Sequence, residues 1–223
     1  MLRLLRILLA ATALVVLLPS SGVAEPNAQD LLLPASQISS MGLHLQSSDS
    51  SPPQETVAGP ACEAVDRARA RMTRDTKSFA DESWTDDESV SFVQTAWVSS
   101  TKAAKRLIKA ASGRAGERCD ELVLSTLPDQ PDVTADAASE PVSPKISGAD
   151  KVLGSRDFVT YTFADGGTGY RQYRYTTIRV GDTIIALETS VTADTEDGTS
   201  SVDLYADAAD SWLQDELAAL SSQ

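Results

Sequence analysis

The 223-residue sequence has only one histidine, His44, and only two cysteines. A Ser–His–Asp triad would have to use that histidine, and no G-x-S-x-G segment is present. A zinc site would compete with a disulfide for the cysteines. We therefore expect no catalytic residue, no metal site and no cofactor, and we interpret His44 as a partly exposed strand residue.

Basic residues are also scarce: 19 Lys and Arg stand against 32 Asp and Glu, so the net charge is −13. A surface of this sign repels nucleic acid and anionic lipid head groups. Two of the basic residues, Arg3 and Arg6, precede an apolar run at 7–18, and small residues follow it up to Ala24. This pattern is typical of a signal peptide, residues 1–24. Its removal leaves a net charge of −15.

Long hydrophobic runs are missing beyond this segment. The run at 7–18 is itself shorter than the roughly 20 apolar residues of a membrane span. We therefore expect a secreted or cell-envelope protein with no stable membrane insertion after signal cleavage. An uncleaved anchor is the alternative. Cysteines of exported proteins usually pair, so we predict a Cys62–Cys119 disulfide.

The remaining length suits a flexible polar lead at residues 25–30 and one domain at 31–223. The first half of that domain predicts short elements separated by turn-rich loops. Pro34 and Gly42 bracket a short helix over 34–41, and residues 46–60 are rich in Ser, Pro and Gly and predict a loop. The elements expected next are a helix at 62–71 and a strand within 77–85.

The segment from Ser89 to Cys119 has the clearest pattern. Alternating apolar residues predict a half-buried strand over 89–98. The hydroxyl residues at 99–101 suit a helix cap. The following helix carries apolar residues on one stripe, lysines and an arginine on the other, and ends at Gly113. The apolar stripe consists of Ala103, Ala104, Leu107, Ile108 and Ala111.

The second half predicts an antiparallel meander and a final helix. Residues 127–144 hold four prolines and many acids, and predict a loop with one edge strand. Strands are expected at 157–164, 170–180 and 183–191, joined by the turns ADGGTG and Gly181-Asp182. A helix from about Ser201 would bury Tyr205, Ala208, Ala209, Trp212, Leu213, Leu217 and Leu220. The fold class is α+β: a central, mostly antiparallel sheet with flanking helices, including this C-terminal amphipathic helix.

Two runs of acidic residues invite comparison with calcium sites. One lies at 81–88 and the other at 194–197, and neither has the spacing of an EF-hand loop. We interpret both as solvated loops. A carboxylate pair for glycoside hydrolysis remains open, because the partners of such a pair need not be close in sequence.

The strand at 170–180 interrupts the acidic balance. It has no acidic residue, and its arginines alternate with tyrosines. One face would carry Arg171, Tyr173, Tyr175 and Arg179, which we predict to form or border a ligand-binding surface for anionic or sugar groups. The alternative is an open sheet face whose arginines pair with nearby acids.

The order of these segments resembles the PknH-like extracellular sensor domain of actinobacteria. The matching segments, between about Asp30 and Leu220, are LLLPASQISSMG, PACEAV, SFVQTAWVSSTKAAKRLI, GERC and VGDTIIALETSV with the closing helix. The resemblance implies an antiparallel sheet flanked by helices, with a ligand in a cleft. Family members usually carry two disulfides, whereas this chain has cysteines for the first only. It would be a free-standing exported member without a kinase domain.

Three functions follow as hypotheses. The first is an exported, non-enzymatic sensor-type domain that binds a small or envelope-derived ligand in a cleft beside the sheet. The second is an exported protein-interaction module, such as an inhibitor or cell-envelope accessory factor. The third is a hydrolase that uses a carboxylate pair. A polar cavity favours the first, an exposed Tyr/Arg patch the second, and two facing carboxylates the third.

Overall fold

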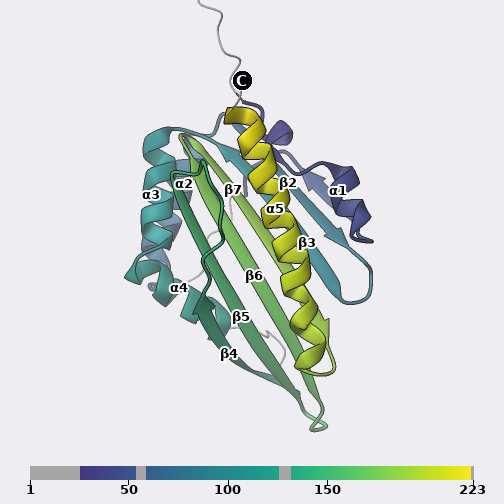
Figure 1. Ribbon diagram of the computed structural model, residues 1–223. Coiled ribbons are helices and arrows are strands. Elements are labelled where there is room, and N and C mark those ends of the chain that lie inside the picture. Colours follow the sequence, from purple (N-terminus) through teal and green to yellow (C-terminus); the bar gives the residue numbers. More distant parts are fainter. Residues whose placement is uncertain (1–25, 54–58, 126–131, 222–223) are drawn as a thin grey trace, which may run out of the picture.

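Seven strands form one antiparallel sheet in the order β1-β2-β3-β7-β6-β5-β4 (Figure 1). The computed structural model describes residues 26–53, 59–125 and 132–221, so the expected signal peptide lies outside it. The strands are β1 His44–Asp49, β2 Ser78–Thr85, β3 Val90–Val98, β4 Val133–Pro141, β5 Lys151–Phe163, β6 Thr168–Val180 and β7 Thr183–Ala193.

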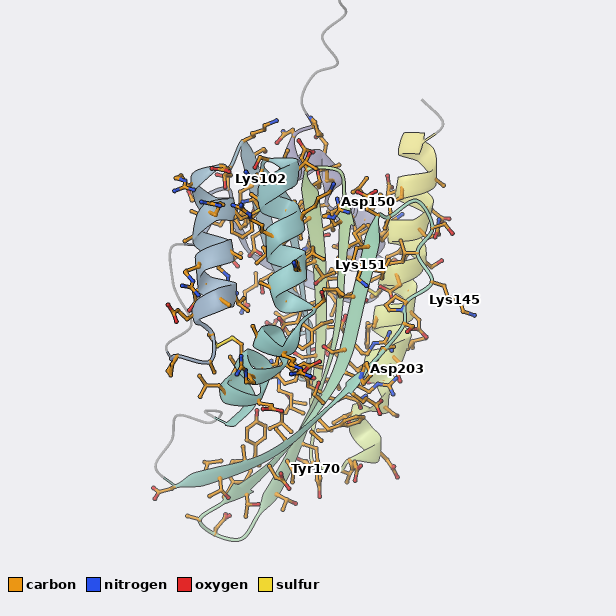
Figure 2. The ribbon with its side chains drawn as sticks, turned by 90° about the vertical axis from the view of Figure 1, so that its left-hand side faces the viewer. Lys102, Lys145, Asp150, Lys151, Tyr170 and Asp203 are labelled. Carbon is orange, nitrogen blue, oxygen red and sulfur yellow. A yellow bond between two sulfur atoms is a disulfide. The ribbon has the colours of Figure 1, made fainter. Side chains whose placement is uncertain are left out.

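Helices cover both faces of the sheet, which confirms the α+β prediction. The helices are α1 Ala35–Ser40, α2 Glu63–Arg74, α3 Thr101–Ala111, α4 Arg114–Ser125 and α5 Val202–Ser221, with short 3-10 helices η1 Ala28–Leu31 and η2 Asp197–Ser201. Helices α2, α3 and α4 lie on one side of the sheet, and α5 lies on the other (Figures 1 and 2). Residues from α5, η1 and α1 share the largest core, residues from α2 and α3 share a second, and Val65 packs with the two cysteines in a third.

The predicted strand–cap–helix unit is confirmed. Alternate residues of β3 are buried, including Phe92 and Ala96. The Ser100 hydroxyl accepts a hydrogen bond from the Ala103 amide at 3.2 Å and caps α3. The apolar stripe of α3 then packs on the sheet through Ala103, Ala104 and Ile108.

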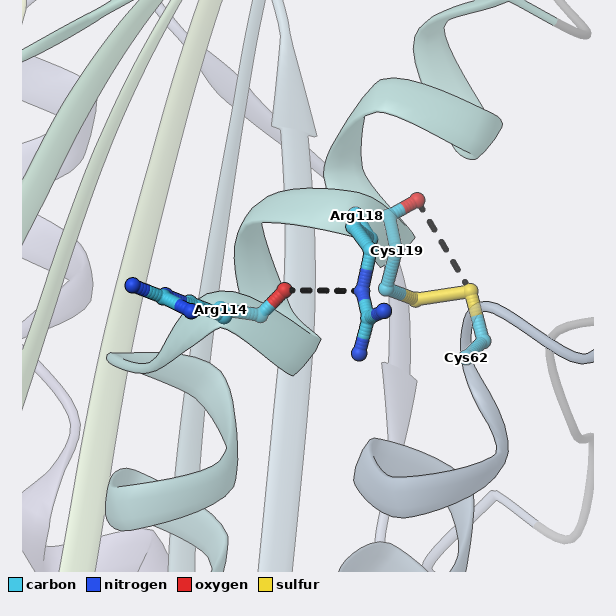
Figure 3. The surroundings of a disulfide bond; sticks show 4 residues. All are labelled: Cys62, Arg114, Arg118 and Cys119. Carbon is cyan, nitrogen blue, oxygen red and sulfur yellow. Dashed lines mark hydrogen bonds between the residues drawn. A yellow bond between two sulfur atoms is a disulfide. The ribbon is translucent and has the colours of Figure 1, made fainter.

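The predicted Cys62–Cys119 disulfide is present and joins the start of α2 to α4 (Figure 3). No sequence pattern predicts a helix over 114–125, because Gly113 suggests a stop. The chain instead turns and begins α4 at Arg114. Gly116 permits this turn, since a Cβ atom there would lie 1.8 Å from the carbonyl oxygen of Ala111. The glycines therefore mark a close helix junction.

Several boundaries differ from the sequence prediction. β1 occupies the first part of the expected 46–60 loop, and β5 begins six residues before the expected 157. β4 is the expected edge strand. The lead at 25–30 was expected to be flexible, yet η1 forms there and Ala28 is fully buried. Period-2 patterning could not reveal β1, because all six of its residues are exposed.

The C-terminal helix is confirmed as a buried, amphipathic element. Ala209, Leu213 and Leu217 are buried, as predicted, and Tyr205 and Trp212 are partly buried against the same core. The Ala208 side chain is half-buried, and that of Leu220 lies outside the described side chains. No helix within the described ranges has the length and apolar character needed to cross a membrane.

Candidate functional site

The two faces of β6 have different neighbours. Side chains of alternate residues point to opposite sides of a strand. Ile178 packs in the core that contains α5, whereas Ile184, which pairs with Arg179, packs with α3. Arg171, Tyr173 and Tyr175 therefore lie on the side of α2–α4, and α5 does not cover them.

Three of the four predicted site residues form one cluster. The rings of Tyr173 and Tyr175 stack with their centroids 5.8 Å apart and their planes within 9°. The guanidinium carbon of Arg171 lies 4.7 Å from the centre of the Tyr173 ring. Arg171 also donates a hydrogen bond from Nη2 to the Ser190 hydroxyl at 2.9 Å. The cation–π contact and the stacking hold the three side chains in a fixed array.

Two carboxyl groups stand beside the tyrosines on neighbouring strands. Asp157 of β5 pairs with Tyr173, and Glu188 of β7 pairs with Tyr175. Burial raises the pKa of both carboxyl groups; a hydrogen bond from Ser139 opposes the shift at Asp157. We refer to Arg171, Tyr173, Tyr175, Asp157, Glu188 and Ser190 as the tyrosine face.

Helix α4 brings a further acid to this face. Burial together with the charges of Asp157 and Glu117 raises the pKa of Asp120 to about 6. Burial also raises the pKa values of Tyr173 and Tyr175, so both phenols stay protonated at neutral pH. The ends of β4, β5 and β6 curve toward the side of the molecule that carries α4 (Figure 2). The tyrosine face is thus rich in hydrogen-bonding groups and contains one cation.

Arg179 lies apart from the cluster. It is eight residues from Arg171 along one strand, which corresponds to about 26 Å. Its Nη1 forms an ion pair with Asp150 at 2.7 Å and donates to the Gly181 carbonyl at 3.1 Å. Only 11% of its side chain is exposed. Its contacts are those of a residue that ties β6 to the segment before β5.

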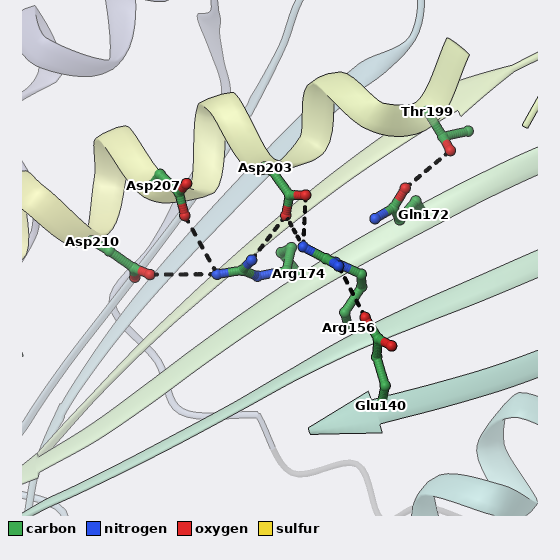
Figure 4. A network of polar contacts seen from close by, with 8 residues as sticks. All are labelled: Glu140, Arg156, Gln172, Arg174, Thr199, Asp203, Asp207 and Asp210. Atoms are coloured by element: carbon green, nitrogen blue, oxygen red, sulfur yellow. Dashed lines mark hydrogen bonds and ion pairs between the residues drawn. The ribbon is translucent and has the colours of Figure 1, made fainter. Parts of the chain in front are cut away.

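Arg174, on the opposite face, belongs to a polar network under α5 (Figure 4). Its guanidinium contacts Asp203 at 2.8 Å, and Asp207 and Asp210 at 3.6 and 3.7 Å. Arg156 of β5 donates to both oxygens of Asp203, at 2.5 and 2.6 Å. Three carboxylates spaced along one side of α5 therefore meet two arginines of the sheet, which fixes the helix to the sheet.

The other candidates from the sequence have structural roles. His44 is an exposed residue of β1 and lies 3.1 Å from Asp87. Asp86 accepts hydrogen bonds from three backbone amides in the β2–β3 turn. The acidic run at 81–88 was expected to be a solvated loop, but its first part lies in β2, where Glu82 is buried. Within the described ranges, no group of three His, Cys, Asp or Glu side chains is placed to hold a metal ion.

Glu82 belongs to a buried network that the sequence did not reveal. It accepts hydrogen bonds from Gln94 at 2.8 Å and from the Trp84 indole at 3.2 Å. Gln94 also bonds both backbone groups of Leu33, at 2.8 and 3.2 Å. Leu33 and Gln94 are 61 residues apart in sequence, so no local sequence pattern indicates their contact.

The fold is an antiparallel sheet between two helical layers. A solved structure with this arrangement is the extracellular domain of PknH from Mycobacterium tuberculosis. The likeness has a TM-score of 0.53 and 13% sequence identity, and covers 87% of this chain and 96% of that chain. At this identity it shows the fold. No protein-family model matches the sequence. No curated protein matches it either.

Proposed function

We propose that the protein is an exported, non-enzymatic domain of sensor type that binds a ligand at the tyrosine face. The signal-peptide pattern of residues 1–24 and the Cys62–Cys119 disulfide support export. The likeness in fold to an extracellular domain supports a role outside the cell. The seven-stranded sheet offers a rigid base on which side chains keep their positions.

The observation that carries this proposal is a set of buried polar atoms without partners. Asp157 is 7% exposed, and its Oδ1 has no hydrogen-bond partner in the described part of the chain; the same holds for Nε of Arg171. Leaving such groups unsatisfied costs about 1–3 kcal/mol each. A ligand that hydrogen-bonds them would recover that free energy. Both atoms belong to the tyrosine face.

The charge of the face selects the class of ligand. Asp157, Glu188 and Asp120 outnumber Arg171, so a strongly anionic ligand meets net repulsion. Carboxyl and phenol groups suit a ligand rich in hydroxyl groups, and the partly exposed ring of Tyr175, held by the buried Tyr173, supplies rigid contact area. The proposal is therefore a neutral saccharide. Of the anionic and sugar groups expected from the sequence, the charge of the face supports the sugar.

Calorimetric titration tests this proposal with two oligosaccharides of similar length. The probes are N-acetylchitotetraose, which is neutral, and tetragalacturonate, which is anionic. We expect binding of the neutral probe only. Tyr175→Ala and Arg171→Gln should each weaken it about tenfold, which corresponds to 1.4 kcal/mol.

Tyr170→Ala is the matched control, because Tyr170 is on β6 but its side chain is on the opposite face. It should bind like the parent protein. The proposal is wrong if the parent protein binds neither probe, if it prefers the anionic one, or if Tyr170→Ala weakens binding as much as Tyr175→Ala.

A further inference from the structure

Positive charge is concentrated on two neighbouring helices of this acidic protein. Helices α2 and α3 together carry eight Lys and Arg residues and only two acids, Glu63 and Asp66. The whole chain has a net charge of −13. Both helices lie on the side of the sheet away from α5 (Figure 2). The strand β6, from which the sequence predicted the positive surface, instead has its arginines in contact with partners inside the fold.

A groove of about 660 Å³ runs between these helices. Its basic residues are Arg67, Arg71, Arg74, Arg106 and Lys109, and its small residues are Ala64, Ala68, Ala70 and Ala110. Because alanine side chains end at Cβ, they leave the furrow between the helices open, and the long basic side chains border it. We call this set of residues the basic groove. Among the described residues, no acidic side chain lines it.

Few neighbouring acids neutralise the basic groove. Arg67 pairs with Glu63 at 3.2 Å, and Arg74 with Asp75 at 3.5 Å. The Arg67 and Glu63 side chains are 71% and 65% exposed, so their attraction is weak in water. α3 contains no acidic residue. Within the described residues, no ion pair involves Arg106 or Lys109.

We propose that the basic groove binds an acidic segment of a partner polypeptide. Arginine presents planar donors that match a carboxylate, and the groove supplies four arginines. The groove runs along α2 and α3, so an extended or helical segment can lie in it. The alanines of the groove can contact the apolar side of such a peptide. Screening confines the attraction to about 8 Å at physiological salt. A short segment stays within that range, whereas a membrane or a long polyanion extends over acidic parts of the chain. This inference is independent of the saccharide proposal.

Fluorescence anisotropy tests the proposal with a labelled peptide of about twelve residues that alternates Glu and Ala. The same peptide with Lys in place of Glu is the charge control, and vesicles of equal parts phosphatidylglycerol and phosphatidylcholine form a separate arm. We expect the Glu peptide alone to bind at physiological salt. Arg71→Glu with Arg106→Glu, one change from each helix, should weaken that binding at least about tenfold.

The matched control is Lys145→Glu with Lys151→Glu, which changes the net charge equally at exposed sites outside the groove (Figure 2). It should weaken binding less than about twofold. Equal weakening by both pairs would overturn the proposal, as would vesicle binding without peptide binding, or no peptide binding at all. If the first pair does not fold, Arg106→Gln with Lys109→Gln replaces it.

Discussion

The guanidinium of Arg174 on β6 lies 2.8 Å from the carboxylate of Asp203 on α5, and only 5% of the arginine side chain is exposed. Asp203 also accepts two hydrogen bonds from Arg156 on the neighbouring strand. One aspartate thus joins two strands to the C-terminal helix. The pairing satisfies charges that the sheet would otherwise bury alone.

Arg174→Met should therefore lower the free energy of unfolding by roughly 3 kcal/mol, because the mostly buried carboxylate of Asp210 loses its arginine partner and Asp203 keeps only Arg156. Urea unfolding followed by circular dichroism measures this change. Asp207→Asn is the control: that side chain is 73% exposed and 3.6 Å from the guanidinium. Its effect should stay below about 1 kcal/mol. Equal effects of the two changes would contradict a buried network.

Removing the disulfide should destabilise the protein strongly. The bond closes a loop between residues 57 apart, for which the chain-entropy model gives about 4 kcal/mol. We expect Cys62→Ala with Cys119→Ala to lose that amount in urea unfolding. Hydrogen exchange should quicken most in α4, which the bond joins to α2. Unchanged exchange in α4 would show that its packing holds it without the bond.

Gln94→Leu tests the buried network around Leu33. The change leaves both backbone groups of Leu33 without partners and removes a hydrogen bond to the buried Glu82, at a cost of roughly 2–6 kcal/mol. Hydrogen exchange should increase over Ala28–Ser40 while the sheet keeps its protection. Gln37→Leu is a matched control, because the buried Oε1 of Gln37 has no partner in the described chain. A similar loss in both variants would mean that side-chain shape, and not hydrogen bonding, sets the effect.

Stability should increase as the pH falls from 7 toward 5. Burial raises the folded-state pKa of Asp157, Glu188 and Asp210, and the pKa of Asp120 rises to about 6. A carboxyl group with a raised folded-state pKa binds protons more tightly in the folded protein, so protonation favours folding. The increase in the free energy of unfolding begins as the pH falls to the raised folded-state pKa values. It is complete below the pKa of about 4 that these carboxyl groups have in the unfolded chain.

Thermal unfolding monitored between pH 7 and pH 5 measures this increase as a higher Tm. Asp120→Asn should remove the part of the increase centred near pH 6 and leave the rest. A Tm that stays constant or falls over this range in the parent protein would show that the raised pKa values do not govern its stability.

Local patterns predicted the elements that local forces determine. The Ser100 cap and the Gly181 turn, with φ 60°, stand where the sequence placed them. The alternating apolar residues of β3 are also buried as predicted, because a strand with one buried face has an apolar residue at every second position. The exposed strand β1 carries no such signal: His44 was interpreted as a strand residue, but 46–49 were predicted to be loop.

The candidate site was predictable only along β6. Alternation places Arg171, Tyr173 and Tyr175 on one face, and the structure brings these three together. Asp157 and Glu188 lie beside these residues because β5 and β7 pair with β6. The sequence of β6 alone does not show which residues of the neighbouring strands lie opposite it. Arg179 shares the alternation, but its ion pair with Asp150 depends on the segment before β5.

The strand order also has a consequence for how the sheet assembles. β1, β2 and β3 form one set of neighbouring strands, and β4, β5, β6 and β7 form another; among the described strands the two sets pair only through β3 and β7. At that seam Phe92 lies opposite Thr189, almost a hundred positions along the chain. The β2–β3 hairpin and the pairs β4–β5, β5–β6 and β6–β7 form by short loop closures, whereas the β1–β2 connection includes α2 and the seam requires a closure over almost a hundred residues. We therefore expect the pairing of β3 with β7 to be the slow step in forming the sheet.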